Sequence, residues 1–286
     1  MQHPFVALQS EYAALLSRVV ITRPAEINLT AGRLLKYIDA GHYKRGCDET
    51  GVPQPVAAAS FEREAGSNFN LSPAQGDPWS RPSVHVPAHR GPFANWTLAQ
   101  IDAYKIDGLE EVGAANWSWE RACYEEELFN GFGYRARGLH SPYLWGGTNV
   151  QQPGKFTSDN HFDPSAMDTQ LGVVPMMLRL VQMRPVLALP VPLPAAARAE
   201  TVAGSKPAPV PPPAPVPLGH HDAAALQTAL TRLGASPPLD VDDNFGKQTW
   251  HAVRAFQFRV GLQPDGIAGP ATWTAITARL TPRASA

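Results

Sequence analysis

The stretch PQPVAAASFEREAG, residues 53–66, predicts a helix. Proline is tolerated in a first helical turn, and glycine is a normal helix exit. At about 100° per residue, Glu64 shares a face with the apolar side chains, whereas Glu62 points roughly 200° away from it. We therefore expect Glu62 to be solvated or paired with a nearby base such as Arg63 or Arg90.

Glu64 is the candidate catalytic acid in this stretch. A carboxyl that is desolvated beside an aromatic side chain, here Phe61, has its ionised form disfavoured and its pKa raised. A raised pKa suits a general acid for glycoside cleavage near neutral pH. Spacing alone favours a plainer interpretation, in which Glu64 is a satisfied or exposed carboxylate.

Helical patterns dominate the chain before residue 184. Apolar residues recur at steps of three and four, which is typical of amphipathic helices, and Pro175 is expected in a first turn or at a kink. Residues 76–93 are too rich in proline and glycine for a helix and predict a short hairpin or irregular β region. The fold class is mainly α, with helices expected within residues 4–20, 31–43, 53–65, 96–109, 117–133 and 168–183.

Composition excludes several classes of function. The formal net charge is -1, with 24 basic and 25 acidic residues, so the electrostatic attraction that drives nucleic-acid binding is absent. Two cysteines, Cys47 and Cys123, are interpreted as structural thiols, and the sequence leaves open whether they pair. No apolar run of about 18 residues predicts a membrane span, and the N-terminal stretch lacks the basic region of a signal peptide.

Residues 184–219 form a proline-rich linker by composition. Eleven of the 29 prolines lie between Pro185 and Pro217, mixed with alanine and valine. Such a sequence favours extended polyproline II at about 3.1 Å per residue. We expect it to join a first domain, residues 1–183, to a C-terminal domain, residues 220–286.

The C-terminal domain contains a half-repeat. The pattern G-x-x-T-W occurs at Gly246–Trp250 and again 23 residues later, at Gly269–Trp273. Each glycine precedes a predicted helix. We expect three short helices around one core, with the apolar side chains of Trp250, Val253, Phe256, Val260, Trp273 and Ile276.

This domain resembles the common three-helix peptidoglycan-binding domain. The resemblance is carried by LQTALTRLG, DDNFGKQTWHAVRAFQFRVGL and PDGIAGPATW, where turns, helix starts and core residues fall in register. Asn244 departs from the pattern, since the first turn usually carries glycine there. The match covers about 20% of the chain and implies bacterial peptidoglycan as a partner.

The first domain resembles lysozyme-superfamily peptidoglycan hydrolases of phage endolysins and prophages. The similarity spans about residues 5–183 and is carried by FEREAGSNF, residues 61–69, by residues 75–93 and by residues 123–172. It implies a lysozyme-like α+β catalytic domain in which Glu64 is the catalytic acid. Family members often carry histidine where this chain has Phe61.

The resemblance implies a sugar groove with further site residues. Asp77 is expected to face Glu64 as a base, nucleophile or charge-stabilising partner, although a turn residue before Pro78 is an equal alternative. Asn130 is expected to bind an N-acetyl group. Flat surfaces for sugar rings are expected from Tyr134, Tyr143 and Trp145. Glu125, Glu126 and Glu127 are the next candidates for the proton donor.

These features predict a muramidase that cleaves the β-1,4 bond between N-acetylmuramic acid and N-acetylglucosamine without a cofactor. A lytic transglycosylase is the alternative if Glu64 works alone. A zinc peptidase or amidase is disfavoured, because Pro87 denies a helix to His85 and His89, and HFD, with His161 and Asp163, lacks a third ligand at convincing spacing. A non-catalytic wall-binding protein is the remaining reading.

The expected context is phage or prophage lysis. We expect a monomer that is made in the cytoplasm, does not insert stably into membranes, and reaches the cell wall through a holin-like partner.

Overall fold

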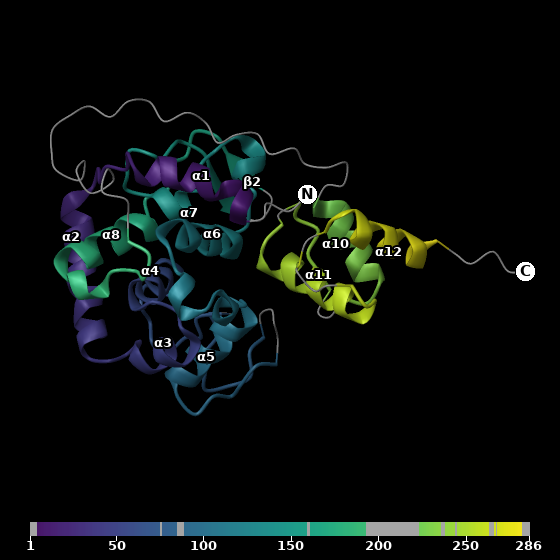
Figure 1. Ribbon diagram of the computed structural model, residues 1–286, viewed down its shortest axis with the longest axis horizontal. Coiled ribbons are helices and arrows are strands. Elements are labelled where there is room, and N and C mark those ends of the chain that lie inside the picture. Colours follow the sequence, from purple (N-terminus) through teal and green to yellow (C-terminus); the bar gives the residue numbers. More distant parts are fainter. Residues whose placement is uncertain are drawn as a thin grey trace, which may run out of the picture.

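The computed structural model describes residues 5–74, 76–84, 89–158, 161–192, 223–235, 238–243, 245–262, 266 and 268–281, and the fold is mainly helical (Figure 1). The helices of the first domain are α1 (Phe5–Leu16), α2 (Pro24–Asp39), α3 (Lys44–Thr50), α4 (Gln54–Ala65), α5 (Trp96–Ile106), α6 (Trp119–Asn130), α7 (Pro142–Trp145) and α8 (Val173–Met183). Short 3-10 helices are η1 (Leu109–Val112), η2 (Ala114–Asn116), η3 (Arg135–Arg137) and η4 (Pro185–Leu187). The C-terminal domain contains α10 (Ala223–Arg232), α11 (Lys247–Arg259) and α12 (Pro270–Leu280).

Helix α4 forms where the sequence predicts a helix, and it is enclosed by its neighbours. Ala57, Ala58 and Ala59 are at most 1% exposed, and their small side chains let α4 pack closely against its neighbours, chiefly α8 and also α2. The helix ends as expected at Gly66, which adopts the left-handed conformation at φ 58°. Pro175 lies in the first turn of α8, which is one of the two positions expected for it.

An aromatic cluster anchors the irregular segment that follows α4. Phe61 lies 5.3 Å from Phe69 and 5.0 Å from Trp96 between ring centroids. The Trp96 indole donates a hydrogen bond to the Leu71 carbonyl, and the Trp79 indole donates to the Phe69 carbonyl. The segment is therefore held by the ends of α4 and α5 and needs no sheet of its own.

The strands lie in a different place from the one expected. Around residues 76–93 the described part holds an isolated bridge between Leu71 and Pro78 but no strand, and residues 85–88 lie outside the described range. An antiparallel pair forms instead between β1 (Lys155–Ser158) and β2 (His161–Asp163). Its four- and three-residue strands are too short for a periodic sequence signal.

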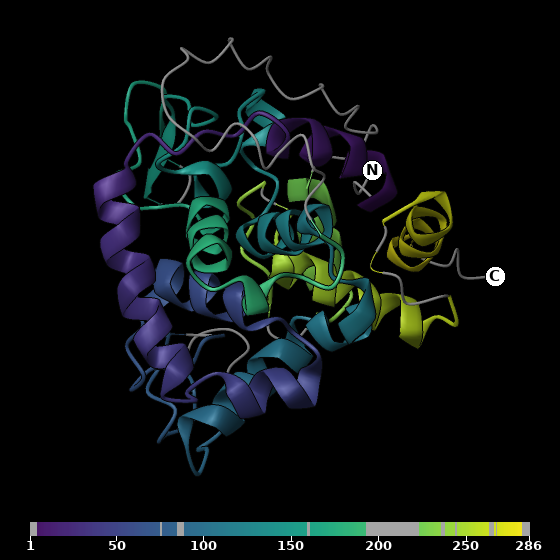
Figure 2. The same ribbon diagram turned by 60° about the vertical axis from the view of Figure 1, so that its left-hand side comes forward.

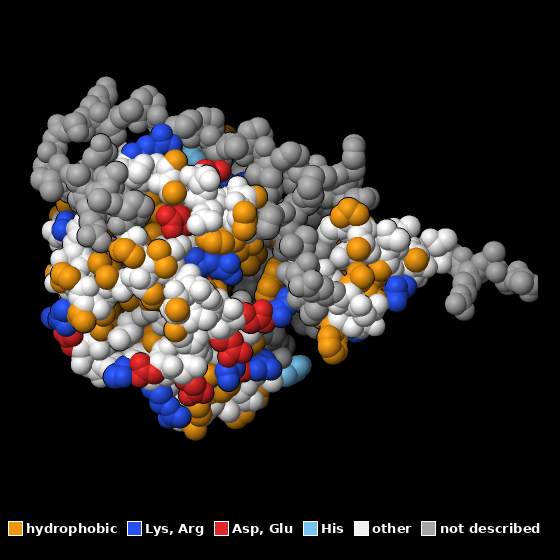
Figure 3. Space-filling model, in the orientation of Figure 1, with side chains coloured by type: hydrophobic (Ala, Val, Ile, Leu, Met, Phe, Trp, Pro, Cys, Tyr) orange, Lys and Arg blue, Asp and Glu red, His pale blue; other side chains and the backbone are white. Residues whose placement is uncertain are grey.

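Both cysteines are buried free thiols. Burial raises the pKa of each thiol, so both side chains are neutral members of the core, as the composition predicted. No helix in the described ranges is long and apolar enough to cross a membrane. Charged side chains are scattered over the face shown in Figure 3 and do not gather in one patch.

Two buried glutamines make equivalent hydrogen bonds in the two halves of the repeat. Gln227 Nε2 donates to Thr249 Oγ1 at 3.1 Å, and Gln257 Nε2 donates to Thr272 Oγ1 at 3.0 Å. Each glutamine oxygen also accepts from backbone amides of the following turn, among them Asp242 N and Gly266 N. The repeat therefore places a threonine where a glutamine from the preceding helix ties the turn to the helix start.

The predicted core of this domain is correct except at Trp250. Val253, Phe256 and Ile276 are buried at its centre, with Val260 and Trp273 packed against them. Trp250 instead packs against the core of the first domain. Figures 1 and 2 both place α11 beside the first domain, and α11 contacts α6.

The first domain extends past the expected boundary at residue 183. Leu189 is 3% exposed and belongs to the core, and Val191 N donates a hydrogen bond to the Trp117 carbonyl at 3.1 Å. Residues 184–192 therefore belong structurally to the first domain, although their proline content resembles that of a linker.

This packing gives the first prediction. A chain ending at residue 183 should have a free energy of unfolding about 2 kcal/mol lower than a chain ending at residue 192, because it lacks the buried Leu189 side chain. Its unfolding midpoint should therefore lie at a lower urea concentration. Urea unfolding followed by circular dichroism measures the difference. Leu189→Ala in the longer chain is the matched control and should lose a similar amount, whereas equal midpoints for all three would show that the segment adds no stability.

Candidate functional site

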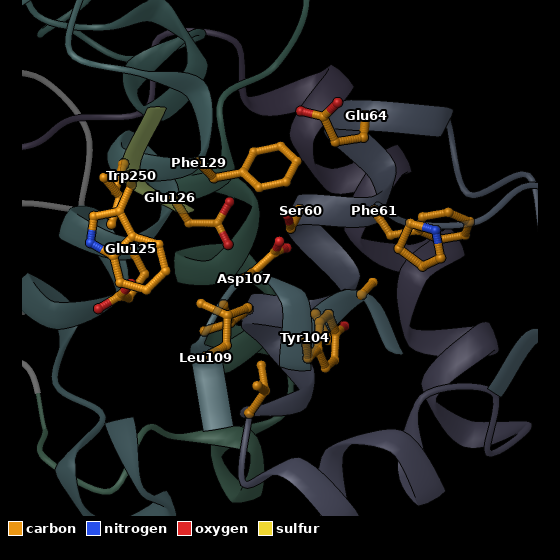
Figure 4. Close-up of a pocket in the computed structure, with 16 residues that line it drawn as sticks. Ser60, Phe61, Glu64, Tyr104, Asp107, Leu109, Glu125, Glu126, Phe129 and Trp250 are labelled. Atoms are coloured by element: carbon orange, nitrogen blue, oxygen red, sulfur yellow. The ribbon is translucent and has the colours of Figure 1, made fainter. Parts of the chain in front are cut away.

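A pocket opens between α4, α5, η1 and α6, and it encloses about 630 Å³ of atom-free space including its mouth (Figure 4). Its apolar lining comes chiefly from Val56, Phe61, Leu109 and Phe129. Four carboxyl-bearing residues also line it, namely Glu64, Asp107, Glu125 and Glu126. An apolar pocket with a few converging polar groups is the usual form of a small-molecule or active site.

Three consecutive residues at the end of α4 point in three directions. Glu62 pairs with Arg33 of α2 and accepts a hydrogen bond from Ser67 Oγ. The Arg63 guanidinium lies 2.5 Å from the buried carboxylate of Asp168. Glu64 is exposed at the pocket. The opposite orientations of Glu62 and Glu64 are as expected.

The expected partners of Glu62 were wrong. Arg63 is taken by Asp168, and Arg90 forms its ion pair with Asp102. Arg33 replaces them because α2 packs beside α4, which is a tertiary contact with no local signal in the sequence.

Glu126 is the buried carboxyl of the pocket. It is 4% exposed, and burial, together with the charges of Glu64 and Glu125, raises its pKa to about 8 against the lowering effect of Ser60 and Tyr143. Figure 4 shows its side chain pointing into the pocket toward Ser60, with the Phe129 ring on the side nearer Glu64. Glu126 is therefore mostly protonated at neutral pH.

The two neighbours of Glu126 in the sequence have different surroundings. Burial raises the pKa of Glu125 to about 7, although Arg121 Nη2 lies 2.6 Å from Glu125 Oε1. Glu127 faces the other side of α6, where it accepts hydrogen bonds from Tyr12 Oη at 2.7 Å and Arg135 Nη2 at 2.8 Å. The structure thus brings two of the three glutamates to the pocket.

The polar members of the expected sugar-binding wall have internal contacts. Asn130 Nδ2 donates to Ser141 Oγ at 3.2 Å, and Tyr134 Oη accepts from Phe156 N at 3.3 Å. Trp145 is 1% exposed, so it offers no flat surface to a ligand. None of these three residues lines the pocket. A role for Asn130 and Tyr134 as substrate contacts stays a prediction, whereas the burial of Trp145 does not fit the exposed flat surface expected of it.

Tyr143 lies directly behind the pocket. It is 4% exposed, and the Arg63 guanidinium stands 5.3 Å from the centre of its ring. Burial and the charges of Glu64 and Glu126 raise the pKa of the Tyr143 hydroxyl well above its usual value. Tyr143 is therefore a neutral hydroxyl beside two carboxyls and does not present its ring face to a ligand.

Asp77 does not face Glu64 across this pocket. Its side chain is 5% exposed, and its Oδ2 accepts a hydrogen bond from Val84 N at 2.8 Å. Its backbone carbonyl accepts from Ser72 N at 2.7 Å. Asp77 thus closes the loop between residues 72 and 84, as the alternative interpretation of a turn residue expects.

The histidine patterns add no second site to the described part of the chain. The described residues hold no group of three or more His, Cys, Asp or Glu side chains that could bind a metal. His85 lies outside the described range, and of His161 only the backbone is described.

Sequence reasoning missed Trp250 as a pocket residue. Its indole ring lines the pocket from α11, on the side of Glu125 and opposite Glu64 (Figure 4). The Arg254 guanidinium stands 4.6 Å from the ring centre, and Arg254 Nη2 lies 2.6 Å from Glu111 Oε1. The only available signal was the repeat, which placed Trp250 in the core of its own domain.

The buried carboxyl of Glu126 gives the second prediction. The folded pKa of about 8 lies above the usual value of 4.5, so between these values the folded state binds more protons than the unfolded state. Stability therefore falls as pH rises through this window. Glu126→Gln should reduce the number of protons released on unfolding in this window by about one. The substitution should therefore stabilise the fold more at pH 8 than at pH 5, and each unit of pKa shift corresponds to about 1.4 kcal/mol in the free energy of unfolding.

Thermal unfolding at several pH values measures the effect. Parallel pH curves for Glu126→Gln and the unmodified protein would contradict a raised pKa.

Comparisons with known proteins concern the C-terminal part of the chain. Residues 220–276 match a family model described as a putative peptidoglycan binding domain. An uncharacterized protein in the bpoA1 3' region of Kitasatospora aureofaciens is 51% identical over 49 residues, which are 17% of this chain and 42% of that protein. No solved structure matches the chain. The chain therefore carries a peptidoglycan-binding module at residues 220–276.

Proposed function

We propose that the protein cleaves the glycan strands of peptidoglycan at the β-1,4 bond between N-acetylmuramic acid and N-acetylglucosamine. The observation that carries the proposal is the meeting of Glu64 and Glu126 at one pocket, in a chain that also carries a peptidoglycan-binding module. Glycosidases use two carboxyl groups, one that donates a proton to the leaving oxygen and one that stays ionised.

The two carboxyls divide these roles by their surroundings. Two interacting carboxyls lose their protons in two steps, so near neutral pH the pair holds about one proton and one negative charge. The charge of Glu64 raises the pKa of Glu126, which couples the two groups. In the free protein the proton of the pair resides mostly on Glu126. When a glycan binds, this proton passes to the exposed Glu64, which donates it to the glycosidic oxygen, and Glu126 is left as the ionised second carboxyl.

Tyr143 and Ser60 support this pair. Both hydroxyls lie close enough to Glu126 to lower its pKa, and Tyr143 stays neutral because burial and the two carboxyls raise its own pKa. Neutral hydroxyls beside the pair can donate hydrogen bonds to whichever carboxyl is ionised.

A lytic transglycosylase is the second candidate, and the position of Asp77 favours it. With Asp77 held by Val84, the exposed carboxyl Glu64 can act as acid and then as base while the 6-hydroxyl of the substrate attacks. Mass spectrometry of muropeptides released from purified sacculi separates the candidates. Reducing-end muramic acid indicates hydrolysis, 1,6-anhydro products indicate transglycosylation, and cleaved stem peptides with intact glycan would overturn the proposal.

The biological setting is part of the proposal. A role in phage or prophage lysis accords with the resemblance of the first domain to endolysins. In that setting the protein acts on the wall after a holin-like partner releases it.

The third prediction concerns Glu64. Glu64→Gln should abolish release of glycan fragments, with a loss of about 10²–10⁴ in rate or more, because the amide cannot donate a proton to the leaving oxygen. Thermal stability and sedimentation with sacculi should stay close to those of the unmodified protein. Glu62→Gln is the matched control and should keep its activity, because Glu62 faces Arg33. A Glu64→Gln variant with a tenth of the normal activity would move the proton donor elsewhere, and Glu126 is the next residue to test.

The fourth prediction concerns Asp77. Asp77→Asn should reduce the rate mildly and lower stability by about 1 kcal/mol, because it weakens the hydrogen bond from Val84 N without removing a group from the pocket. Rates on purified sacculi and thermal unfolding are measured side by side. A loss in rate as severe as that of Glu64→Gln, at unchanged stability, would make Asp77 a catalytic partner.

A further inference from the structure

Trp250 and Trp273 occupy equivalent positions in the repeat but different surroundings in the structure. Each follows a buried threonine, Thr249 or Thr272, near the start of a helix. Trp273 packs on the core of its own domain, whereas Trp250 packs on the core of the first domain. The peptidoglycan-binding module is thus held together without the ring of Trp250, which is directed outward to the pocket.

The contact between Trp250 and the first domain is close. A Cβ atom on Gly108 would lie 2.9 Å from Trp250 Cη2, so only glycine fits at this point of the first domain. On the other side, Gly266 approaches the Trp250 indole so closely that a Cβ there would lie 2.3 Å from Nε1. Two glycines with positive φ, at 68° and 73°, therefore leave room for the ring to reach the pocket.

An ion pair fixes the ring in this position. Arg254, one helical turn after Trp250, covers the indole and reaches Glu111 of η1. Arg254 is 25% exposed and Glu111 56% exposed, so the pair contributes orientation more than stability. The module thus presents one aromatic side chain to the pocket through a small contact.

We propose that Trp250 is a substrate-positioning residue, contributed by the peptidoglycan-binding module to the pocket of the first domain. The inference rests on the proposed function and names a substrate class, a glycan strand whose sugar ring lies against the indole. Aromatic rings provide flat apolar surface with little loss of conformational entropy, which suits them to bind the apolar face of a ring.

The layout of the pocket fits this role. Trp250 and Glu125 lie at one end of the pocket and Glu64 at the other (Figure 4). The indole therefore leaves the exposed carboxyl uncovered. A sugar unit on Trp250 would place the following part of the strand toward Glu64, so the module aligns the strand that it holds at the wall with the site of cleavage.

The test uses the full chain and two readouts. On soluble tetrasaccharides of alternating N-acetylglucosamine and N-acetylmuramic acid, Trp250→Ala should raise KM about tenfold with little change in kcat, as expected for about 1.4 kcal/mol of lost binding. In the Glu64→Gln background, calorimetric titration with the same tetrasaccharide should show a similar loss of affinity. Trp250→Tyr should restore most of the binding, because tyrosine keeps a flat ring.

Phe258→Ala is the matched control, because Phe258 is an aromatic residue on the same helix with 76% of its surface exposed. It should change neither KM nor affinity. Trp250→Ala should still sediment with sacculi, because the module keeps its own core.

Four results would overturn the inference. The first is an unchanged affinity of Trp250→Ala for the tetrasaccharide, and the second is an equal loss of affinity in Phe258→Ala. The third is a loss of sedimentation with sacculi in Trp250→Ala. The fourth is a higher activity of Trp250→Ala on the tetrasaccharide, which would mean that the docked module blocks the pocket. If the unmodified protein cleaves no glycan, the proposed function is wrong. The titration does not depend on turnover, so it still decides whether Trp250 binds the tetrasaccharide.

Discussion

The close packing of α4 against α8 is the constraint on which the site depends. The alanines at positions 57–59 bring the helix axes together, and this fixes the rotation of α4 about its own axis. With that rotation fixed, Glu62 faces α2, Arg63 reaches Asp168, and Glu64 is left at the pocket. A side chain larger than alanine at any of these buried positions would push α4 from one of its neighbours and move all three groups together.

The ion pair of Arg63 reinforces this arrangement. Burial acts to raise the pKa of Asp168, but the charges of Arg63 and Lys155 and the hydrogen bond from Gln170 N hold it below its usual range. Asp168 is therefore ionised at neutral pH and ties the end of α4 to the segment before α8. The same guanidinium lies over the Tyr143 ring, so one side chain positions both the end of α4 and the hydroxyl behind the pocket.

The carboxyls of α6 show how position on one helix decides the surroundings of a side chain. Glu127 is satisfied by Tyr12 and Arg135, and this network ties α1 to α6. Glu126, about 100° away, has the neutral hydroxyls of Ser60 and Tyr143 as partners and keeps a raised pKa. A buried carboxyl of this kind costs stability when ionised, and such costs are typical of functional sites.

The sequence by itself determined the longer helices, although not α3 or α7, together with the exit at Gly66, the opposite directions of Glu62 and Glu64, and the three-helix module. Each of these depends on local periodicity, turn residues or a motif. It could not place the short β1–β2 pair or the packing of residues 184–192 on the first domain, since neither has periodicity of its own. It also could not choose among Glu125, Glu126 and Glu127, or tell Trp250 from Trp273. Only the tertiary structure decided these points, because desolvation and ion pairing depend on which surfaces meet. Trp250 and Trp273 share the same local pattern, but Trp250 packs on the first domain and Trp273 on the core of its own domain.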